Sequence, residues 1–488
     1  MSEFSTQLSR VIHSRNINVY SMSKYCGMDR SSMYKIISGK RSPSSMELVN
    51  RISDFLHLTP LEHQEFVKAY RITSIGEDIY YRRKDVQNFL MHFPDSFSLN
   101  QDSSAIFETS EDSLSCIDTP CISLQNQFDV NRIMKKIFNS ESHKPQGKIA
   151  LFLQPEYDFL FRLLENMDIP ETLNIQHIMC LHNTDALTPP ADKRHDTLAY
   201  LKTIFPLYIK NLNYQAYYFY DNIPAHFYNM NLMPCLILTS QYAMTLSSDF
   251  QYGIFYSESS VVSLLWGIFH NDLATCSPLF NVIRLMPENI NSLTQMTLST
   301  ACAPVNYLLQ PEACFTPFIS REITEHVLYP GLPHRQQFLD MITEYFAEIR
   351  KIMLDNPTYI YFTDRGVSRF ARTGTLKEIP DGFATAFSPD DRRQILRDFL
   401  PYCMNGKYRM IKPPLDQFPL NLHLCINEQT GFMAFENAAG ETMYLIINET
   451  GFLNLFIDYI ESLDTKENIF LYTPEETTQF IKQIIDKL

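Results

Sequence analysis

The chain has 488 residues, of which 45% are hydrophobic and 13% aromatic, enough to build several buried cores. Its net charge of −14 argues against a protein that binds nucleic acid over its whole surface. The sequence shows no run of eighteen apolar residues and no apolar segment after Met1. We therefore expect no membrane span, no secretory signal and a cytoplasmic location, where the ten scattered cysteines would stay reduced.

The charge is distributed unevenly along the chain. Residues 1–93 hold 13 Lys/Arg against 9 Asp/Glu, so the acidic excess lies in the remainder. Within the stretch CGMDRSSMYKIISGKR (26–41), four cations and no acid fall between Arg30 and Arg41. A basic N-terminal module on an acidic body is typical of a local nucleic-acid footprint.

Apolar periodicity predicts a first helix within residues 4–15, FSTQLSRVIHSR, because the apolar residues recur on one helical face. Asn18 is suited to cap a second helix that runs through Cys26. Gly27 then fits a tight turn, since glycine readily adopts positive φ.

Asp29 can cap a third helix over residues 30–38, which Gly39 would end. Two further capping boxes start a fourth and a fifth helix, at Ser44-x-x-Glu47 and at Thr59-Pro60-Leu61-Glu62. Five short helices with a tight turn before the third describe a helix-turn-helix domain.

Residues 4–72 resemble the phage-repressor (XRE, Cro/C1-type) helix-turn-helix family. The residues that carry the resemblance are Met22, Ser23, Gly27, Met28, Asp29, Met33, Ile36, Gly39, Arg41, Pro43 and Leu56. The family often has Gln near the start of its second helix, where it meets a phosphate, whereas Val19 stands there in this chain. The resemblance implies that the third helix enters the major groove by its N-terminal residues.

The resemblance also implies which side chains contact double-stranded DNA. The predicted contacts to bases, or close to them, are Arg30, Ser31, Tyr34 and Lys35. The predicted contacts to phosphates are Lys24, Ser38, Lys40 and Arg41. The alternative interpretation is a solvated polar helix face without a partner.

Residues 73–145 are interpreted as a connector. EDIYYRRKDVQNFL (77–90) is expected to form a sixth helix, and residues 101–127, rich in Ser, Thr, Asp and Gln, to form a flexible linker. Cys116 and Cys121 form a C-x4-C without a matched second pair, so free thiols are preferred over a zinc site.

Two pairs of similar segments suggest an internal duplication. LKTIFPLYIKNLNY (201–214) matches LRDFLPYCMNGKY (396–408), and SESSVVSLL (257–265) matches NETGFLNLF (448–456). The offsets are 195 and 191 residues, so both matches indicate one long period.

Strand-like runs alternate with helical patterns in both halves, which predicts α/β layers. The expected fold class is therefore an all-α helix-turn-helix N-terminal domain followed by a duplicated α/β C-terminal region. The predicted domains are residues 1–72, the connector 73–145, a first repeat 146–275, an inter-repeat connection 276–334 and a second repeat 335–488. The pattern loosely resembles phospholipase-D-like sensor domains, but the H-x-K signature of the hydrolases is missing.

No catalytic motif is found, and we expect neither an enzyme nor a bound metal or cofactor. His177, Cys180 and His182 lie close together but are interpreted as ordinary strand residues. Cys403 and Cys425 are interpreted as buried, inert thiols rather than nucleophiles.

One constellation is a candidate effector site. Arg365, Arg369 and Arg372 are expected to lie along a loop and the first turns of a helix, where a small anionic effector could bind. The preferred interpretation is that these arginines form surface salt bridges with the acidic body.

Together these patterns predict a homodimeric transcription regulator. It would read an operator through the N-terminal module and be controlled by a ligand-sensing or oligomerisation region. The alternatives are an enzyme tethered to nucleic acid and a protein-interaction scaffold.

Overall fold

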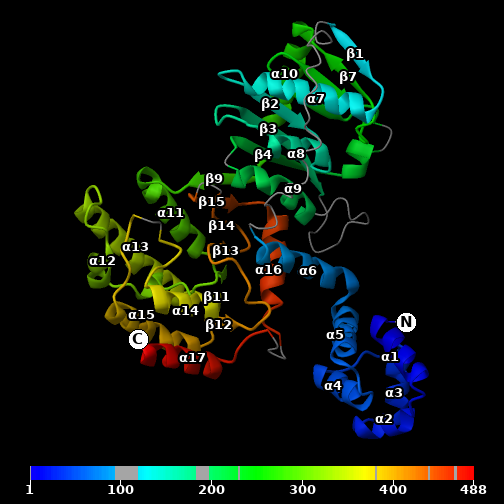
Figure 1. The fold of residues 1–488 in the computed structure, drawn as a ribbon, viewed down its shortest axis with the longest axis vertical. Coiled ribbons are helices and arrows are strands. Elements are labelled where there is room, and N and C mark those ends of the chain that lie inside the picture. Colours follow the sequence, from blue (N-terminus) through cyan, green and yellow to red (C-terminus); the bar gives the residue numbers. More distant parts are fainter. Residues whose placement is uncertain are drawn as a thin grey trace. The chain divides into compact units, whose positions relative to one another are not determined.

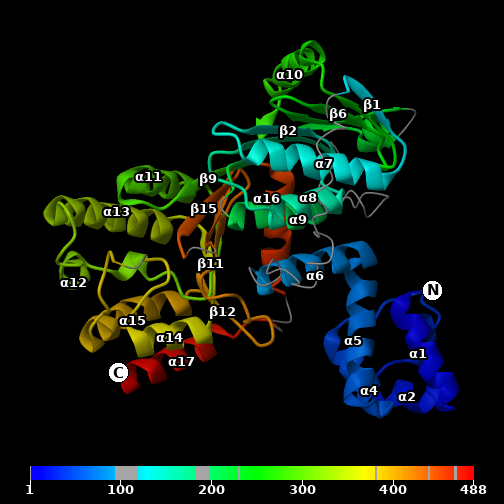
Figure 2. The same ribbon diagram turned by 45° about the horizontal axis from the view of Figure 1, so that its top comes forward.

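The computed structural model divides into two compact units, residues 1–87 and 88–488. It describes residues 2–93, 119–182, 197–210, 212–228, 231–379, 382–437, 440–465 and 470–488. Figures 1 and 2 show the fold in two views. No helix among these residues has the length and apolar character needed to cross a membrane.

The N-terminal unit is built from helices. These are α1 (Glu3–Ser14), α2 (Val19–Tyr25), α3 (Arg30–Ile37), α4 (Met46–Phe55) and α5 (Pro60–Ile75). The predicted sixth helix is present as α6 (Glu77–Met91), which begins in the N-terminal unit and ends in the C-terminal unit. The core is apolar, with Leu8, Met22 and Met33 fully buried at its centre.

The predicted helix starts are mostly confirmed. The side chains of Asn18, Asp29 and Thr59 each accept hydrogen bonds from backbone N–H groups in the first turn of their helix. The predicted start of α4 is wrong, because Ser45 rather than Ser44 is the cap. Ser45 holds the extended backbone just before the helix, and its Oγ accepts from the N–H three residues on.

The first sheet of the C-terminal unit has eight strands in the order β1-β7-β6-β5-β2-β3-β4-β8. Their bounds are β1 (Cys121–Leu124), β2 (Lys148–Phe152), β3 (Asn174–His182), β4 (Tyr214–Asp221), β5 (Cys235–Thr239), β6 (Ala243–Leu246), β7 (Gly253–Tyr256) and β8 (Ser277–Pro278). The neighbours β2, β3 and β4 are parallel, and the other pairs are antiparallel.

Helices cover both faces of the first sheet. They are α7 (Gln127–Ser142), α8 (Asp158–Asn166), α9 (Thr197–Ile209) and α10 (Ser259–Leu273), with a π-turn at η5 (Pro224–Tyr228). Trp266 of α10 packs on the face that carries Ile178. Phe161 of α8 contacts His177 on the opposite face, because successive residues of a strand point to opposite sides.

The second sheet has seven strands in the order β12-β11-β10-β13-β14-β15-β9. Their bounds are β9 (Phe280–Arg284), β10 (Asn306–Leu309), β11 (Thr358–Thr363), β12 (Tyr408–Ile411), β13 (His423–Ile426), β14 (Gly431–Glu436) and β15 (Thr442–Ile447). The neighbours β10, β11 and β12 are parallel, and the others are antiparallel. Six consecutive strands of each sheet follow one common order, β2 to β7 in the first and β10 to β15 in the second.

In Figures 1 and 2, α16 lies on the opposite side of the second sheet from α11, α13 and α15. The helices around this sheet are α11 (Ile290–Ala301), α12 (Arg321–Val327), α13 (Arg335–Asp355), α14 (Asp364–Thr373), α15 (Pro389–Met404), α16 (Thr450–Glu461) and α17 (Pro474–Lys487). Short 3-10 turns lie at η6 (Pro287–Asn289) and η7 (Thr316–Phe318).

The fold class expected from the sequence is wrong. An all-α domain followed by a duplicated α/β region does not describe a chain whose C-terminal part holds two large mixed sheets of eight and seven strands. Strand–helix alternation detects parallel crossovers, but it does not detect short antiparallel strands joined by tight turns, such as β5 to β7. The expected connector and inter-repeat segments also contribute strands, namely β1, β8, β9 and β10.

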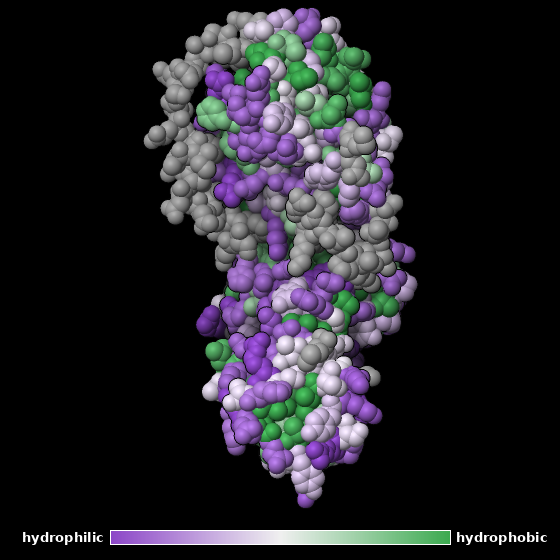
Figure 3. Space-filling view, turned by 90° about the vertical axis from the view of Figure 1, so that its right-hand side faces the viewer, coloured by the Kyte–Doolittle hydropathy of each residue, from purple (hydrophilic) through white to green (hydrophobic). Residues whose placement is uncertain are grey.

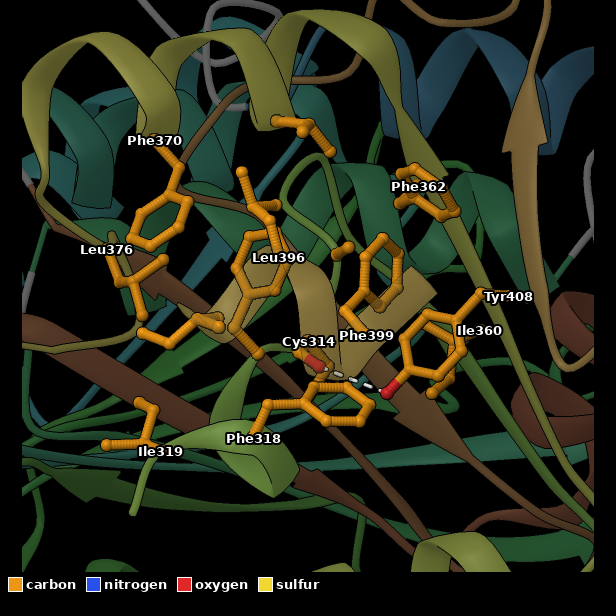
Figure 4. Close-up of a cluster of buried hydrophobic side chains, with 14 of the residues drawn as sticks. Cys314, Phe318, Ile319, Ile360, Phe362, Phe370, Leu376, Leu396, Phe399 and Tyr408 are labelled. Carbon is orange, nitrogen blue, oxygen red and sulfur yellow. Dashed lines mark hydrogen bonds between the residues drawn. The ribbon is translucent and has the colours of Figure 1, made fainter. Parts of the chain in front are cut away.

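A buried aromatic cluster fills the side of the second sheet that faces α15 (Figure 4). The ring of Phe399 lies 4.8 Å from that of Tyr408 and 5.8 Å from that of Phe362. The Tyr408 hydroxyl donates a hydrogen bond of 3.1 Å to the Cys314 carbonyl, so the one polar atom of this ring is satisfied inside the core.

On the face drawn in Figure 3, hydrophobic side chains gather near the top and in a smaller group toward the lower end, with hydrophilic side chains around them. Exposed apolar residues such as Leu61, Phe128 and Leu264 belong to different helices. Single apolar residues on a surface are ordinary and need no special explanation.

We predict that Phe399→Ala lowers the free energy of unfolding by about 3–5 kcal/mol, because it removes a fully buried ring and leaves a cavity. Urea unfolding of the full chain, followed by far-UV circular dichroism, measures the effect. Met404→Ala on the same helix is the control, since Met404 is 50% exposed and its change should stay within about 0.5 kcal/mol. Equal effects of the two substitutions would contradict the assignment of this core.

Candidate nucleic-acid interface

The turn between α2 and α3 fixes the direction of α3. Gly27 has a φ of 67°, a conformation that residues with a Cβ rarely adopt. The N–H of Met28 bonds back to the Ser23 carbonyl at 2.9 Å and closes the end of α2. Met33 and Ile36 are buried in the core and Ile37 packs against it, whereas most of the other residues of α3 are exposed.

Both ends of α3 are held by side chains or by glycine. The Asp29 carboxylate accepts from the Ser32 N–H at 2.9 Å, and hydrogen bonds from Ser32 hold the pKa of Asp29 below its usual value. Ser9 of α1 donates to the carbonyl of Ile37 at 3.1 Å. Gly39, at a φ of 74°, ends the helix as predicted.

The four residues predicted to contact bases are all exposed on α3, and they are Arg30, Ser31, Tyr34 and Lys35. Arg30 and Tyr34 lie one turn apart and interact, with the guanidinium 5.5 Å from the ring centre. A hydrogen bond of 3.5 Å from Arg30 to the Tyr34 hydroxyl links them further. This pair therefore presents a cation and an aromatic hydroxyl from the first five residues of the helix.

The four residues predicted to contact phosphates, Lys24, Ser38, Lys40 and Arg41, are exposed as well. The cations of both groups form no ion pair with any residue that the structure describes. Elsewhere in the N-terminal unit, Arg15 pairs with Glu62 at 2.5 Å and Arg51 with Glu47 at 2.6 Å. The positive charge around α3 is therefore left available, while other arginines of the same unit are neutralised.

Two features at the start of α2 refine the sequence interpretation. Val19 packs partly against the core, so its position offers no polar side chain to a phosphate. Tyr20, which sequence reasoning did not name, is 52% exposed, and Lys24 lies over its ring at 5.5 Å. Its position in the first turn of α2, beside the family's phosphate-contacting position, was the signal that could have identified it.

The three arginines proposed as an anion site lie on α14 but are not equivalent. Arg369 forms an ion pair with Glu312, a residue that is only 1% exposed, and donates two further bonds to Thr375. Arg365 bonds to the Gln417 side chain at 3.0 Å, and Arg372 is exposed. One of the three cations is thus committed to a buried carboxylate of the fold.

Most of the histidine and cysteine candidates are buried in the fold, namely His177, Cys180, Cys403 and Cys425. His177 is fully buried between the Tyr214 hydroxyl at 2.6 Å and the Leu153 carbonyl at 2.9 Å. Burial lowers its pKa to about 4, so it stays neutral. Burial also raises the pKa of the Cys403 and Cys425 thiols, which disfavours the reactive thiolate.

No group of three metal-ligating side chains occurs among the described residues. Of the C-x4-C pair, Cys121 is exposed on β1, and Cys116 lies outside the described part of the chain.

No protein-family model and no curated protein matches the sequence. Among solved structures, a remote neighbour is TrmBL2, an archaeal chromatin protein whose structure is described as showing a novel mode of DNA binding. The identity is 10%, the match covers 45% of this chain and 72% of that chain, and the TM-score is 0.20. A likeness this remote carries no argument about the present chain.

We predict that Asp29→Ala speeds amide hydrogen exchange in α3, because loss of the cap costs about 1 kcal/mol of helix stability. Asp29→Asn is the matched control, since an amide oxygen can accept the same bond without the charge, and it should leave exchange nearly unchanged. Both are measured by mass spectrometry on the full chain. Equal acceleration in the two variants would show that the charge, not the cap, stabilises the helix.

Proposed function

We propose that this chain is a DNA-binding transcription regulator of the phage-repressor-like type. The observation that carries the proposal is the unpaired basic face of α3, which is held by the Gly27 turn and the Asp29 cap. Between Arg30 and Arg41, α3 and the turn after it hold four cations and no acid, on a chain of net charge −14. A surface helix of an acidic protein that only faces solvent would not be expected to carry cations without any acid.

In this proposal, α3 lies in the major groove with its first turns toward the bases. Arg30 is suited to a bidentate contact with guanine, and Ser31 can donate or accept at either kind of base pair. Lys24, Lys40 and Arg41 neutralise phosphates and set the position of the helix without reading sequence.

We further propose that two copies act together, because operators read by such helices have half-sites about 34 Å apart. The C-terminal unit is assigned a controlling role rather than a catalytic one. Its buried thiols and neutral buried histidine favour that assignment over an enzyme tethered to DNA.

We predict that the double substitution Arg30→Ala and Lys35→Ala weakens binding to a duplex selected by the wild-type chain from random DNA, by at least about tenfold. Because Arg30 and Lys35 are assigned to the bases rather than to phosphates, the slope of log affinity against log salt should fall by less than about 1. Fluorescence anisotropy at several salt concentrations measures both quantities.

Lys68→Ala on α5 is the control, because it removes one exposed cation from the same unit at a distance in sequence from α3. It should change neither affinity nor slope appreciably. Unchanged binding by the double variant would contradict the proposal, and failure to select any duplex would favour a protein-interaction role for the N-terminal unit.

A further inference from the structure

The C-terminal unit contains a cavity of about 210 Å³ between the second sheet and the helices α11 to α13. An apolar cavity of about 150 Å³ can hold benzene, so this space admits an organic molecule of larger size. Its walls come from segments far apart in the chain, including Thr297 of α11, Phe346 of α13 and Phe432 of β14. None of the arginines predicted as an effector site lines it.

Several polar atoms at the cavity have no hydrogen-bond partner in the described structure. They are Nε2 of Gln310, Oγ1 of Thr358 and Nε2 of His423. Gln310 is 5% exposed and Thr358 is 1% exposed, so bulk water does not satisfy these groups. An unpaired buried polar group costs free energy, and several at one cavity indicate a place prepared for polar groups of a ligand.

The charge of the cavity wall is one-sided. Glu378 is the only carboxylic acid among the described lining residues, and no Lys or Arg joins it there. Thr316 donates to one oxygen of the half-buried Glu378 at 3.0 Å, and no hydrogen bond to the other oxygen occurs among the described residues. An anionic ligand would be buried beside this carboxyl without a counter-charge, which is strongly unfavourable.

The remaining wall is apolar and aromatic. Tyr345 and Tyr444 lie close enough to Glu378 that its charge raises the pKa of both phenols, in addition to the larger effect of burial. Phe346 and Phe432 add two further rings. Aromatic faces attract organic cations, most strongly where water is excluded.

We propose that this cavity binds a largely apolar organic amine in its protonated form. The ammonium donates to the free carboxyl oxygen of Glu378, and the apolar body lies among the aromatic rings. A carbonyl or hydroxyl group on the ligand would accept a hydrogen bond from Gln310. The idea that this ligand controls DNA binding rests on the proposed function, whereas the binding of the amine itself does not.

The ionisation of Glu378 gives the proposal a pH signature. Burial, and next the charge of Glu312, raise the pKa of Glu378 to about 7, while the hydrogen bond from Thr316 lowers it. The other titratable groups that interact with Glu378 are Tyr345, Tyr408, Tyr444 and Cys314, all of which stay protonated at neutral pH because burial raises their pKa. Glu312 itself is paired with Arg369.

An ammonium binds the ionised form of Glu378, and that form is lost as the pH falls through 7. The apparent affinity scales with the population of the competent form, so it should be about tenfold weaker at pH 6 than at pH 8.

The test uses three probes with one phenylethyl body: phenethylamine, 2-phenylethanol and 3-phenylpropionate. Isothermal titration of the full chain without DNA at pH 8 should show that phenethylamine binds at least tenfold more tightly than the alcohol. The carboxylate should show no binding at the same concentrations. Phenethylamine should lose about tenfold in affinity at pH 6.

Glu378→Gln should remove both the preference for the amine and its pH dependence, while leaving the affinity for 2-phenylethanol unchanged. Glu344→Gln on the exposed side of α13 is the matched control and should change nothing. Should Glu378→Gln fail to fold, the pH dependence of the wild-type chain decides alone.

Absence of phenethylamine binding, equal or tighter binding of 3-phenylpropionate, or an affinity that is flat between pH 6 and pH 8 would each overturn the proposal. Because DNA is absent from these titrations, their failure leaves the DNA-binding proposal standing. If the chain does not bind DNA, the amine titrations still decide whether the cavity binds an organic cation.

Discussion

A second aromatic cluster of the C-terminal unit connects its two sheets, and it is formed by Phe89, Phe93, Phe205, Phe435 and Phe456. Their ring centres lie between 4.8 and 6.2 Å apart in the contacting pairs. Each such side chain buries about 150–250 Å², and well-oriented pairs add about 0.5–1.5 kcal/mol beyond that burial. The cluster joins α9 beside the first sheet to β14 and α16 of the second. It also fixes the end of α6, the helix that begins in the N-terminal unit.

Strand β14 connects this cluster with the proposed ligand cavity. Phe432 and Ala434 line the cavity, whereas Phe435 packs against Phe93 at 5.4 Å, because successive residues of a strand point to opposite faces. The same strand thus forms a wall of the cavity and an anchor for the end of α6. A ligand can act through such a strand only as far as it binds one arrangement of β14 more tightly than another. A ligand that fills the cavity would favour one arrangement of β14, because a close-packed interior resists small shifts of the strand that an empty cavity allows.

How far the sequence predicts this fold depends on how local each signal is. The helices of the N-terminal unit follow from residues within one or two turns of each other, such as Asn18 with Tyr20 and Asp29 with Ser32. The same locality explains the single-residue error at Ser45, because two adjacent serines compete for one cap. The sheets depend on pairing between distant segments. Cys121–Leu124 alternates polar and apolar residues over only four positions, too few to predict a strand, and it forms β1 by pairing with the distant β7.

The two candidate sites differ in the same way. The face of α3 comes from one short segment, so its residues could be named from the sequence. The residues that line the cavity are spread along the chain between positions 285 and 444, so no local sequence pattern predicts the cavity. From the sequence, the arginines of α14 were the candidate effector site. In the structure Arg369 forms an ion pair with Glu312 instead, because a buried carboxylate without a counter-charge is strongly unfavourable. That pairing leaves Glu378, a half-buried acid of the same region, without a cation of its own among the residues that line the cavity. Because no cation lies beside the Glu378 carboxylate in the cavity wall, we expect its ligand to supply the positive charge.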